Sequence, residues 1–186
     1  MLRFASIASM LVIGCSDDPL SYSAPVSINL KAKSGDTQNS VVTDEKSITT
    51  ENGNPYGAFV SDTRDALDGR DPAVIDVDQV EVFLGGNSTG VTKLGEVFTG
   101  DVDVLFQMND TNNTYPVATR TLDANTPAGP IEFDLEFPAD AIPDADFDKM
   151  LSGSFKVVVR GGAATGFETK GADADIQTTF TFVAFE

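Results

Sequence analysis

Hydrophobic and polar residues alternate with a period of two along much of this chain. In each clear stretch, apolar residues fall on one face and polar residues on the other. These stretches are 26–33, 101–108, 131–137, 155–160 and 176–183. Such alternation is typical of antiparallel strands that pack on a core from one side only. Weaker strand patterns occupy 40–49, 56–60, 88–98 and 114–122.

The alternation is sharpest at 131–137. It predicts that the apolar residues Ile131, Phe133, Leu135 and Phe137 are buried together, and that Glu132, Asp134 and Glu136 face water. Lys156 and Arg160 on the next long strand would suit those acids if the two strands pair. If the strands lie in opposite sheets instead, Phe133 packs on Phe155 across the core.

The segment 74–84 is long, and its alternation changes phase. Ile75 and Val77 share one face, whereas Val80 and every second residue after it fall on the other. A β-bulge near residues 78–79 would return all of these apolar residues to a single buried face.

Turn-forming residues separate the predicted strands. They lie at 34–36, 52–55, 85–87, 109–113 and 161–162. Helix is predicted only as one or two turns at 62–67 and at 144–151. Eight to ten short strands with regular turns predict an all-β fold, an antiparallel β-sandwich. We expect an immunoglobulin-like topology, the commonest arrangement, with a jelly roll as the alternative.

The first fifteen residues follow a different pattern. Arg3 supplies one positive charge before a mostly apolar stretch at 4–13, as in a secretory signal peptide. That stretch is too short to cross a hydrocarbon core of about 30 Å as a helix. It ends in Val12-Ile13-Gly14-Cys15, which resembles the lipobox of bacterial lipoproteins. An ordinary core thiol at Cys15 is the alternative interpretation.

The lipobox resemblance implies that Cys15 receives a diacylglycerol, that the chain is cut before it, and that the new N-terminus is acylated. Ser16 resembles the residue found in lipoproteins sent to the outer membrane of Gram-negative bacteria. The expected organisation is a signal peptide over 1–14, a lipid-anchored tether over 15–24 and one β-sandwich domain over 25–186. The membrane is then a partner through the acyl chains on Cys15.

Charge narrows the range of partners. The chain has 29 acidic and 12 basic residues, a formal net charge of −17. This balance argues against nucleic acid, which needs lysine and arginine to neutralise phosphates. It argues equally against electrostatic adhesion to anionic lipid, so attachment would come from the acyl chains. A saline habitat would also account for so acidic a surface.

Histidine is absent from the sequence. This removes the Ser-His-Asp and Cys-His nucleophile pairs and the common zinc and haem ligands. An enzyme would have to use carboxylates, as glycosidases do, but acids are too abundant for a pair of them to be informative. We therefore predict a non-catalytic protein, with a small glycoside hydrolase-like enzyme as an alternative.

Three aspartates carry the candidate metal site. Asp144, Asp146 and Asp148 are spaced like the first three ligands of an EF-hand calcium loop, although Lys149 and Phe155 replace its glycine and its bidentate glutamate. They indicate either bound calcium or solvated acids near a helix N-terminus. A second acidic cluster at 62, 65, 68 and 71 has the same two interpretations. We predict no other cofactor.

Three functional hypotheses result. The leading one is a non-catalytic envelope lipoprotein whose sandwich binds a protein or glycan partner or has a structural role. The second is a calcium-dependent carbohydrate-binding or adhesion module, which needs acidic loops and exposed aromatic rings at one end of the sandwich. The third is a small carboxylate-based hydrolase, which needs two acids that face each other in a cleft.

Overall fold

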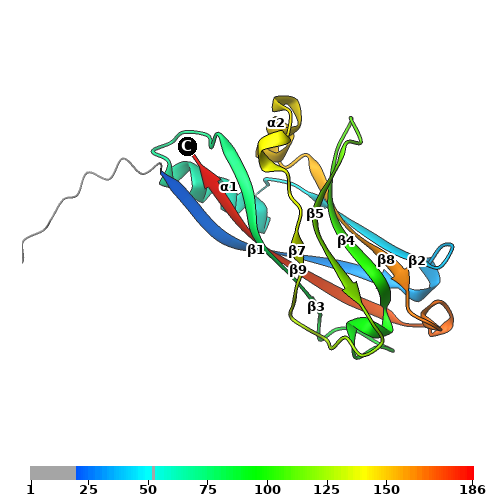
Figure 1. Cartoon of the computed structure of the whole chain (residues 1–186). Coiled ribbons are helices and arrows are strands. Elements are labelled where there is room, and N and C mark those ends of the chain that lie inside the picture. Colours follow the sequence, from blue (N-terminus) through cyan, green and yellow to red (C-terminus); the bar gives the residue numbers. More distant parts are fainter. Residues whose placement is uncertain (1–19, 52) are drawn as a thin grey trace, which may run out of the picture.

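The computed structural model describes residues 20–51 and 53–186, and its strands form two antiparallel sheets (Figure 1). The strands are β1 Ser21–Lys33, β2 Val41–Ile48, β3 Val74–Leu84, β4 Phe98–Met108, β5 Thr114–Leu122, β6 Ile131–Glu132, β7 Asp134–Leu135, β8 Phe155–Ala163 and β9 Asp173–Phe185. The helices are α1 Pro55–Ala66 and α2 Asp144–Ser152, and short 3-10 turns lie at Ser34–Asp36, Leu94–Glu96, Ala139–Ala141 and Phe167–Thr169. The predicted all-β sandwich is confirmed.

The strand order is that of a jelly roll. One sheet has the order β1-β9-β3-β6 and the other β2-β8-β4-β5-β7. The pairs are nested, since β1 pairs with β9, β2 with β8, β3 with β6 and β4 with β5. An immunoglobulin-like sandwich instead places its first and second strands side by side in one sheet. The immunoglobulin-like expectation is therefore wrong and the alternative holds.

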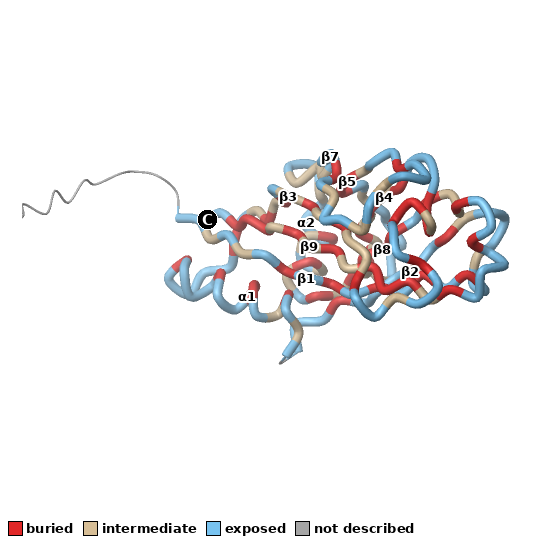
Figure 2. The backbone as a smooth tube through the Cα atoms, turned by 90° about the horizontal axis from the view of Figure 1, so that it is seen from below, coloured by how far each residue is buried: buried red, intermediate tan, exposed pale blue. Residues whose placement is uncertain are grey.

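Period-two alternation places the core between the sheets, where buried and exposed residues follow one another along the strands (Figure 2). In β1 every second residue from Val26 to Ala32 is buried, and in β4 the same holds from Val102 to Met108. The register of β3 against β9 shifts between Val77 and Gln79. The predicted bulge is confirmed, and it keeps the apolar residues on both sides of it in the core.

Helix α1 replaces the weak strand predicted at 56–60. Asn54 caps the helix by accepting the Tyr56 N–H at 3.0 Å, and Pro55 occupies the first turn, where its missing N–H costs nothing. Tyr56 packs edge-on against Phe155 and Phe182. The helix therefore contributes aromatic side chains to the core, and the strand prediction there was wrong.

Of two further expectations, one needs correction and one is confirmed. The pattern at 88–98 forms no strand apart from Phe98, where β4 begins; Thr89 makes an isolated bridge to Asp173. The helical turn predicted at 144–151 is confirmed as α2. Gly153 ends α2 with φ of +66°, and a Cβ there would lie 2.7 Å from the backbone of Thr49. This position therefore requires glycine.

The segment 131–137 is not one strand. Its first half, β6, pairs with β3 in one sheet, and its second half, β7, pairs with β5 in the other. Phe133, between them, is buried, whereas Leu135 is 44% exposed. Of the four apolar residues predicted to be buried together, only Phe133 is fully buried, since Ile131 and Phe137 are half-buried and Leu135 is exposed. The reason is that the chain crosses between the sheets here. The alternative in which this segment pairs with β8 does not hold, because β8 pairs with β2 and β4. The three acids of the segment are exposed, as predicted.

The first strand begins earlier than expected. Residues 21–24, assigned to the tether from their polarity, are the start of β1 and pair with the end of β9. The folded domain therefore reaches to within a few residues of Cys15, which itself lies outside the described residues. Neither of the two described α-helices is long and apolar enough to cross a membrane.

Candidate functional site

An open groove crosses the outer face of the five-stranded sheet and has a volume of about 670 Å³. We call it the sheet-face groove. It extends over β2, β8, β4 and β5, and the turn between β1 and β2 forms one side. Its lining residues are Asp36, Gln38, Asn39, Val41, Thr43, Glu45, Leu105, Gln107, Thr114, Val158 and Arg160.

The groove combines an apolar floor with polar sides. Val158 is buried, and Val41 and Leu105 are half-buried, although all three point away from the core. Amide side chains come from the turn at Gln38 and Asn39. A ligand with apolar ring faces and many hydroxyl groups could contact the floor and exchange hydrogen bonds with these amides.

The strand register leaves one cation of the groove free. Glu45 forms an ion pair with Lys156 on the neighbouring strand. Arg160 lies opposite Asp103 in the β4–β8 register, but Asp103 accepts a hydrogen bond from Thr119 on its other side at 3.0 Å. Among the described residues the Arg160 guanidinium makes no hydrogen bond or ion pair, and the residue is exposed. Its guanidinium therefore remains available to a hydroxyl or carboxylate of a ligand.

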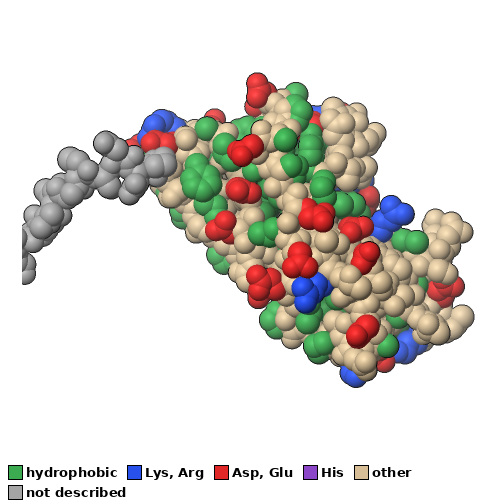
Figure 3. All heavy atoms as spheres, in the orientation of Figure 1, with side chains coloured by type: hydrophobic (Ala, Val, Ile, Leu, Met, Phe, Trp, Pro, Cys, Tyr) green, Lys and Arg blue, Asp and Glu red, His purple; other side chains and the backbone are tan. Residues whose placement is uncertain are grey.

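Acidic side chains dominate the rest of the surface. On the face shown in Figure 3 they are scattered widely, and basic side chains are few. The described ion pairs are mostly exposed, such as Arg64 with Asp71 and Arg120 with Asp134. Exposed pairs of this kind contribute little to stability, typically about 0–1 kcal/mol.

The sequence contains one signal for the groove. Leu105 and Val158 are apolar residues at positions where the alternation of β4 and β8 points outward. A single outward apolar residue is ordinary. The strand register makes these two direct neighbours, and only that pairing turns them into one floor.

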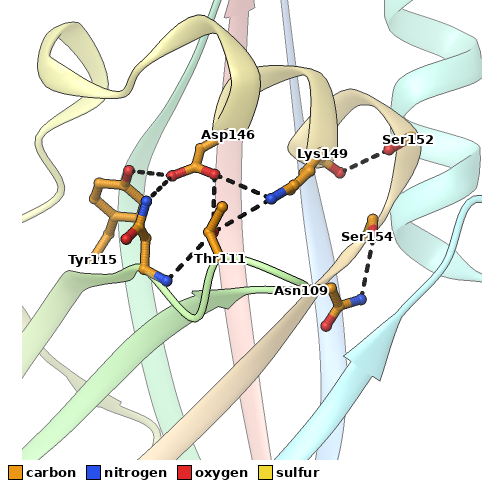
Figure 4. A network of polar contacts seen from close by, with 8 residues as sticks. Asn109, Thr111, Tyr115, Asp146, Lys149, Ser152 and Ser154 are labelled. Atoms are coloured by element: carbon orange, nitrogen blue, oxygen red, sulfur yellow. Dashed lines mark hydrogen bonds and ion pairs between the residues drawn. The ribbon is translucent and has the colours of Figure 1, made fainter.

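A second polar cluster, the Asp146 network, joins α2 to the turn between β4 and β5 (Figure 4). Asp146 is 2% exposed. One of its carboxylate oxygens accepts hydrogen bonds from Asn113 Nδ2 and Tyr115 Oη, each at 2.7 Å. The other accepts from Thr111 Oγ1 at 3.2 Å and from Lys149 Nζ at 3.5 Å. Both oxygens are thus fully occupied by the protein itself.

These contacts shift two pKa values in opposite directions. Hydrogen bonds, chiefly from Asn113 and then Tyr115, lower the pKa of Asp146 below its ordinary value. Desolvation, together with the bond to Asp146, raises the pKa of Tyr115 to about 12. The network is therefore a charged carboxylate held by neutral and cationic donors, which fits a structural fastening.

The structure does not bring the three predicted calcium ligands together. All three lie on α2, where a step of two residues turns the side chain to the opposite side of the helix. Asp146 points inward to its network, whereas Asp144 and Asp148 are exposed. Among residues 20–51 and 53–186, no group of three or more acidic, histidine or cysteine residues is placed to hold a metal ion.

The second acidic cluster is also spread out. Asp62 accepts a hydrogen bond from the Tyr22 hydroxyl at 3.4 Å, and Asp71 pairs with Arg64. Tyr22 itself packs against Phe59 of α1. These contacts fasten α1 to β1. The predicted lipidation site, Cys15, lies outside the described residues.

Comparisons with known proteins add little. No family model matches the chain, and no curated protein matches it. A solved structure described as turnip yellow mosaic virus aligns with 99% of this chain and 90% of its own, at 14% sequence identity and a TM-score of 0.29. A likeness this low supports no conclusion about function.

Proposed function

We propose that this chain is a non-catalytic binding protein of the bacterial cell envelope, held to the outer membrane by acyl chains on Cys15, and that its sheet-face groove binds an extended glycan. The groove carries the proposal, because it has an apolar floor between polar sides. Its floor belongs to hydrogen-bonded strands, so the binding groups are pre-positioned.

The shape of the groove favours a chain-like ligand. It crosses four neighbouring strands, and strands lie about 4.8 Å apart, so the groove is about 14 Å long. That length exceeds a single sugar ring. The side chains along it are mainly amides, hydroxyls and carboxylates, which bind hydroxyl groups as both donors and acceptors.

The chemistry of the groove favours binding over hydrolysis. A glycosidase needs two carboxyl groups that flank one bond, about 5–9.5 Å apart, with one of them protonated. The two acids that line the groove are Asp36 and Glu45, and Glu45 is held by Lys156. Because Glu45 is engaged with Lys156, only Asp36 is left to act on a bond of the ligand, and one acid does not meet the requirement for two.

Membrane attachment rests on the lipobox resemblance. Replacement of Cys15 with Ala should abolish labelling by a clickable fatty acid and release the chain from the membrane fraction. Ser16→Ala is the matched control, because it changes the neighbouring residue and keeps the thiol. Equal labelling of Cys15→Ala and the unaltered chain would contradict the anchor.

Titration calorimetry tests the groove. We expect soluble bacterial envelope polysaccharides to bind, and peptides of similar length not to bind. Gln107→Ala removes a groove amide and should weaken binding about 2–10-fold, the equivalent of one hydrogen bond. Gln79→Ala removes an amide from the outer face of the opposite sheet and should leave affinity unchanged. Equal effects of both variants, or release of reducing ends, would contradict the proposal.

A further inference from the structure

The ends of the described chain meet at one end of the sandwich. Ser21 pairs with Phe185 in the β1–β9 ladder, and the Glu186 N–H donates to the Leu20 carbonyl at 3.1 Å. The ladder continues as far as Lys33 and Asp173. Figure 1 accordingly shows the C-terminus and α1 at one end and the turn between β1 and β2 at the other.

Exposed apolar side chains mark the end where the chain termini meet. Three large apolar residues of the described chain are exposed, namely Leu20 at 39%, Phe185 at 37% and Leu135 at 44%. Two of the three lie at this end. Val74, the partner of Phe185 on β3, is half-buried beside it. We call Leu20, Val74 and Phe185 the terminal patch.

Chain length ties the terminal patch to the anchor. Five residue steps separate Cys15 from Leu20. A fully extended chain covers at most about 3.6 Å per residue, so Leu20 lies within about 18 Å of Cys15. Acyl chains on Cys15 would therefore hold this end of the domain beside the lipid.

We infer that the terminal patch rests on the lipid surface. The sandwich then stands on this end, and the rim of the sheet-face groove faces away from the lipid. This inference rests on the proposed lipid anchor. The groove rim at Asp36 and Asn39 follows the far end of β1. Thirteen strand residues extend about 43 Å. A large soluble glycan could reach the groove at that distance.

Charge specifies the kind of lipid surface. Arg64 and Arg70 near this end are paired with Asp71 and Glu186, and the whole chain carries a formal charge of −17. Anionic headgroups would repel such a protein. The terminal patch therefore fits a zwitterionic lipid surface, which it contacts through apolar side chains.

Single-tryptophan variants test the orientation, because the chain contains no tryptophan. The lipid-modified chain with Phe185→Trp is bound to phosphatidylcholine vesicles that contain brominated lipid. Leu135→Trp is the matched control, since Leu135 is at least as exposed as Phe185 but lies on β7. Leu20→Trp is a second reporter if Phe185→Trp folds poorly, as judged by circular dichroism.

We expect bromine quenching of Phe185→Trp or Leu20→Trp at least twofold stronger than that of Leu135→Trp. Equal quenching at both positions, or none at the terminal patch while the chain sediments with vesicles, would overturn the orientation and leave the anchor intact. If the lipid-modified chain does not sediment with vesicles, both the anchor and the orientation are overturned.

Discussion

The Tyr115 hydroxyl donates a hydrogen bond of 2.7 Å to Asp146, although the two residues are 31 positions apart. The bond fastens α2 to the start of β5, directly after the turn between β4 and β5. Asn113 supplies a second bond of equal length to the same oxygen. A buried carboxylate in this position is held by its donors, and those donors depend on it in turn.

Removal of Asp146 should therefore destabilise the domain strongly. Asp146→Ala removes the acceptor shared by Tyr115, which is half-buried, and Asn113, which is exposed and can bond to water instead. A hydrogen bond to a charged group contributes about 1.5–3 kcal/mol. We expect the free energy of unfolding in urea to fall by about 2–4 kcal/mol in total. Asp148→Ala, an exposed position on the same helix, should change it by less than about 0.5 kcal/mol. Equal losses of unfolding free energy for the two variants would contradict a stabilising role of the Asp146 network.

The same network predicts the pH dependence of stability. The pKa of Asp146 is lowered from 3.8, so its stabilisation is present above pH 3.8 and is lost as pH falls through the lower folded value. The pKa of Tyr115 is raised from 10.0 to about 12, so its stabilisation is present below pH 10 and is lost as pH rises toward 12.

Melting temperatures measured over a range of pH separate the contribution of Asp146 from that of Tyr115. Tyr115→Phe should reduce the loss of stability between pH 10 and 12 relative to the unaltered chain. Asp146→Asn should reduce the loss below pH 3.8, because an amide does not titrate there. Parallel profiles for all three proteins would contradict the shifted pKa values.

The crossing segment between the sheets gives a matched pair of truncations. Phe133 is 2% exposed and Leu135 is 44% exposed. Phe133→Ala should cost about 3–5 kcal/mol of unfolding free energy, close to the whole stability of many domains. Leu135→Ala should cost less than about 1 kcal/mol. A large loss for Leu135→Ala in urea unfolding would restore the single buried strand that the alternation predicted.

Alternation predicted the faces of strands well and their partners poorly. The bulge at Val77 and the inward face of β1 follow from local pattern, because a strand buried on one side must alternate. The nested pairing of β1 with β9 depends on contacts across the whole chain, which no local pattern records. The segment 131–137 misled for the same reason, since its two halves pair with different sheets.

The predictions for the segments that form α1 and the Asp146 network were wrong for different reasons. Asn54 and Pro55 were present as start signals for α1, but the short apolar run after them also fitted a strand. The spacing of Asp144, Asp146 and Asp148 matches a loop in which all three side chains converge on one ion. In α2 the helix instead turns Asp146 away from the other two. Apart from Lys149 on the same helix, its partners lie in the turn before β5 and at the start of β5, far from Asp146 in the sequence.

Calcium should have no specific effect on stability. Asp146 is occupied by four donors, and Asp144 and Asp148 are exposed on another side of α2. We expect millimolar calcium to raise the melting temperature no more than sodium at matched ionic strength, because both screen the net negative charge. A calcium-specific rise that Asp148→Asn removes would establish a metal site, by mass action on the folded state.

Amide NMR spectra of the isotopically labelled chain, recorded with and without a bound envelope oligosaccharide, test the central claim most directly. Binding in the sheet-face groove should shift the signals of Asn39, Thr43, Gln107 and Arg160 and leave those of Gln79 and Thr179, on the opposite outer face, in place. Shifts confined to the opposite sheet, or saturable binding with none of the groove signals moved, would contradict it.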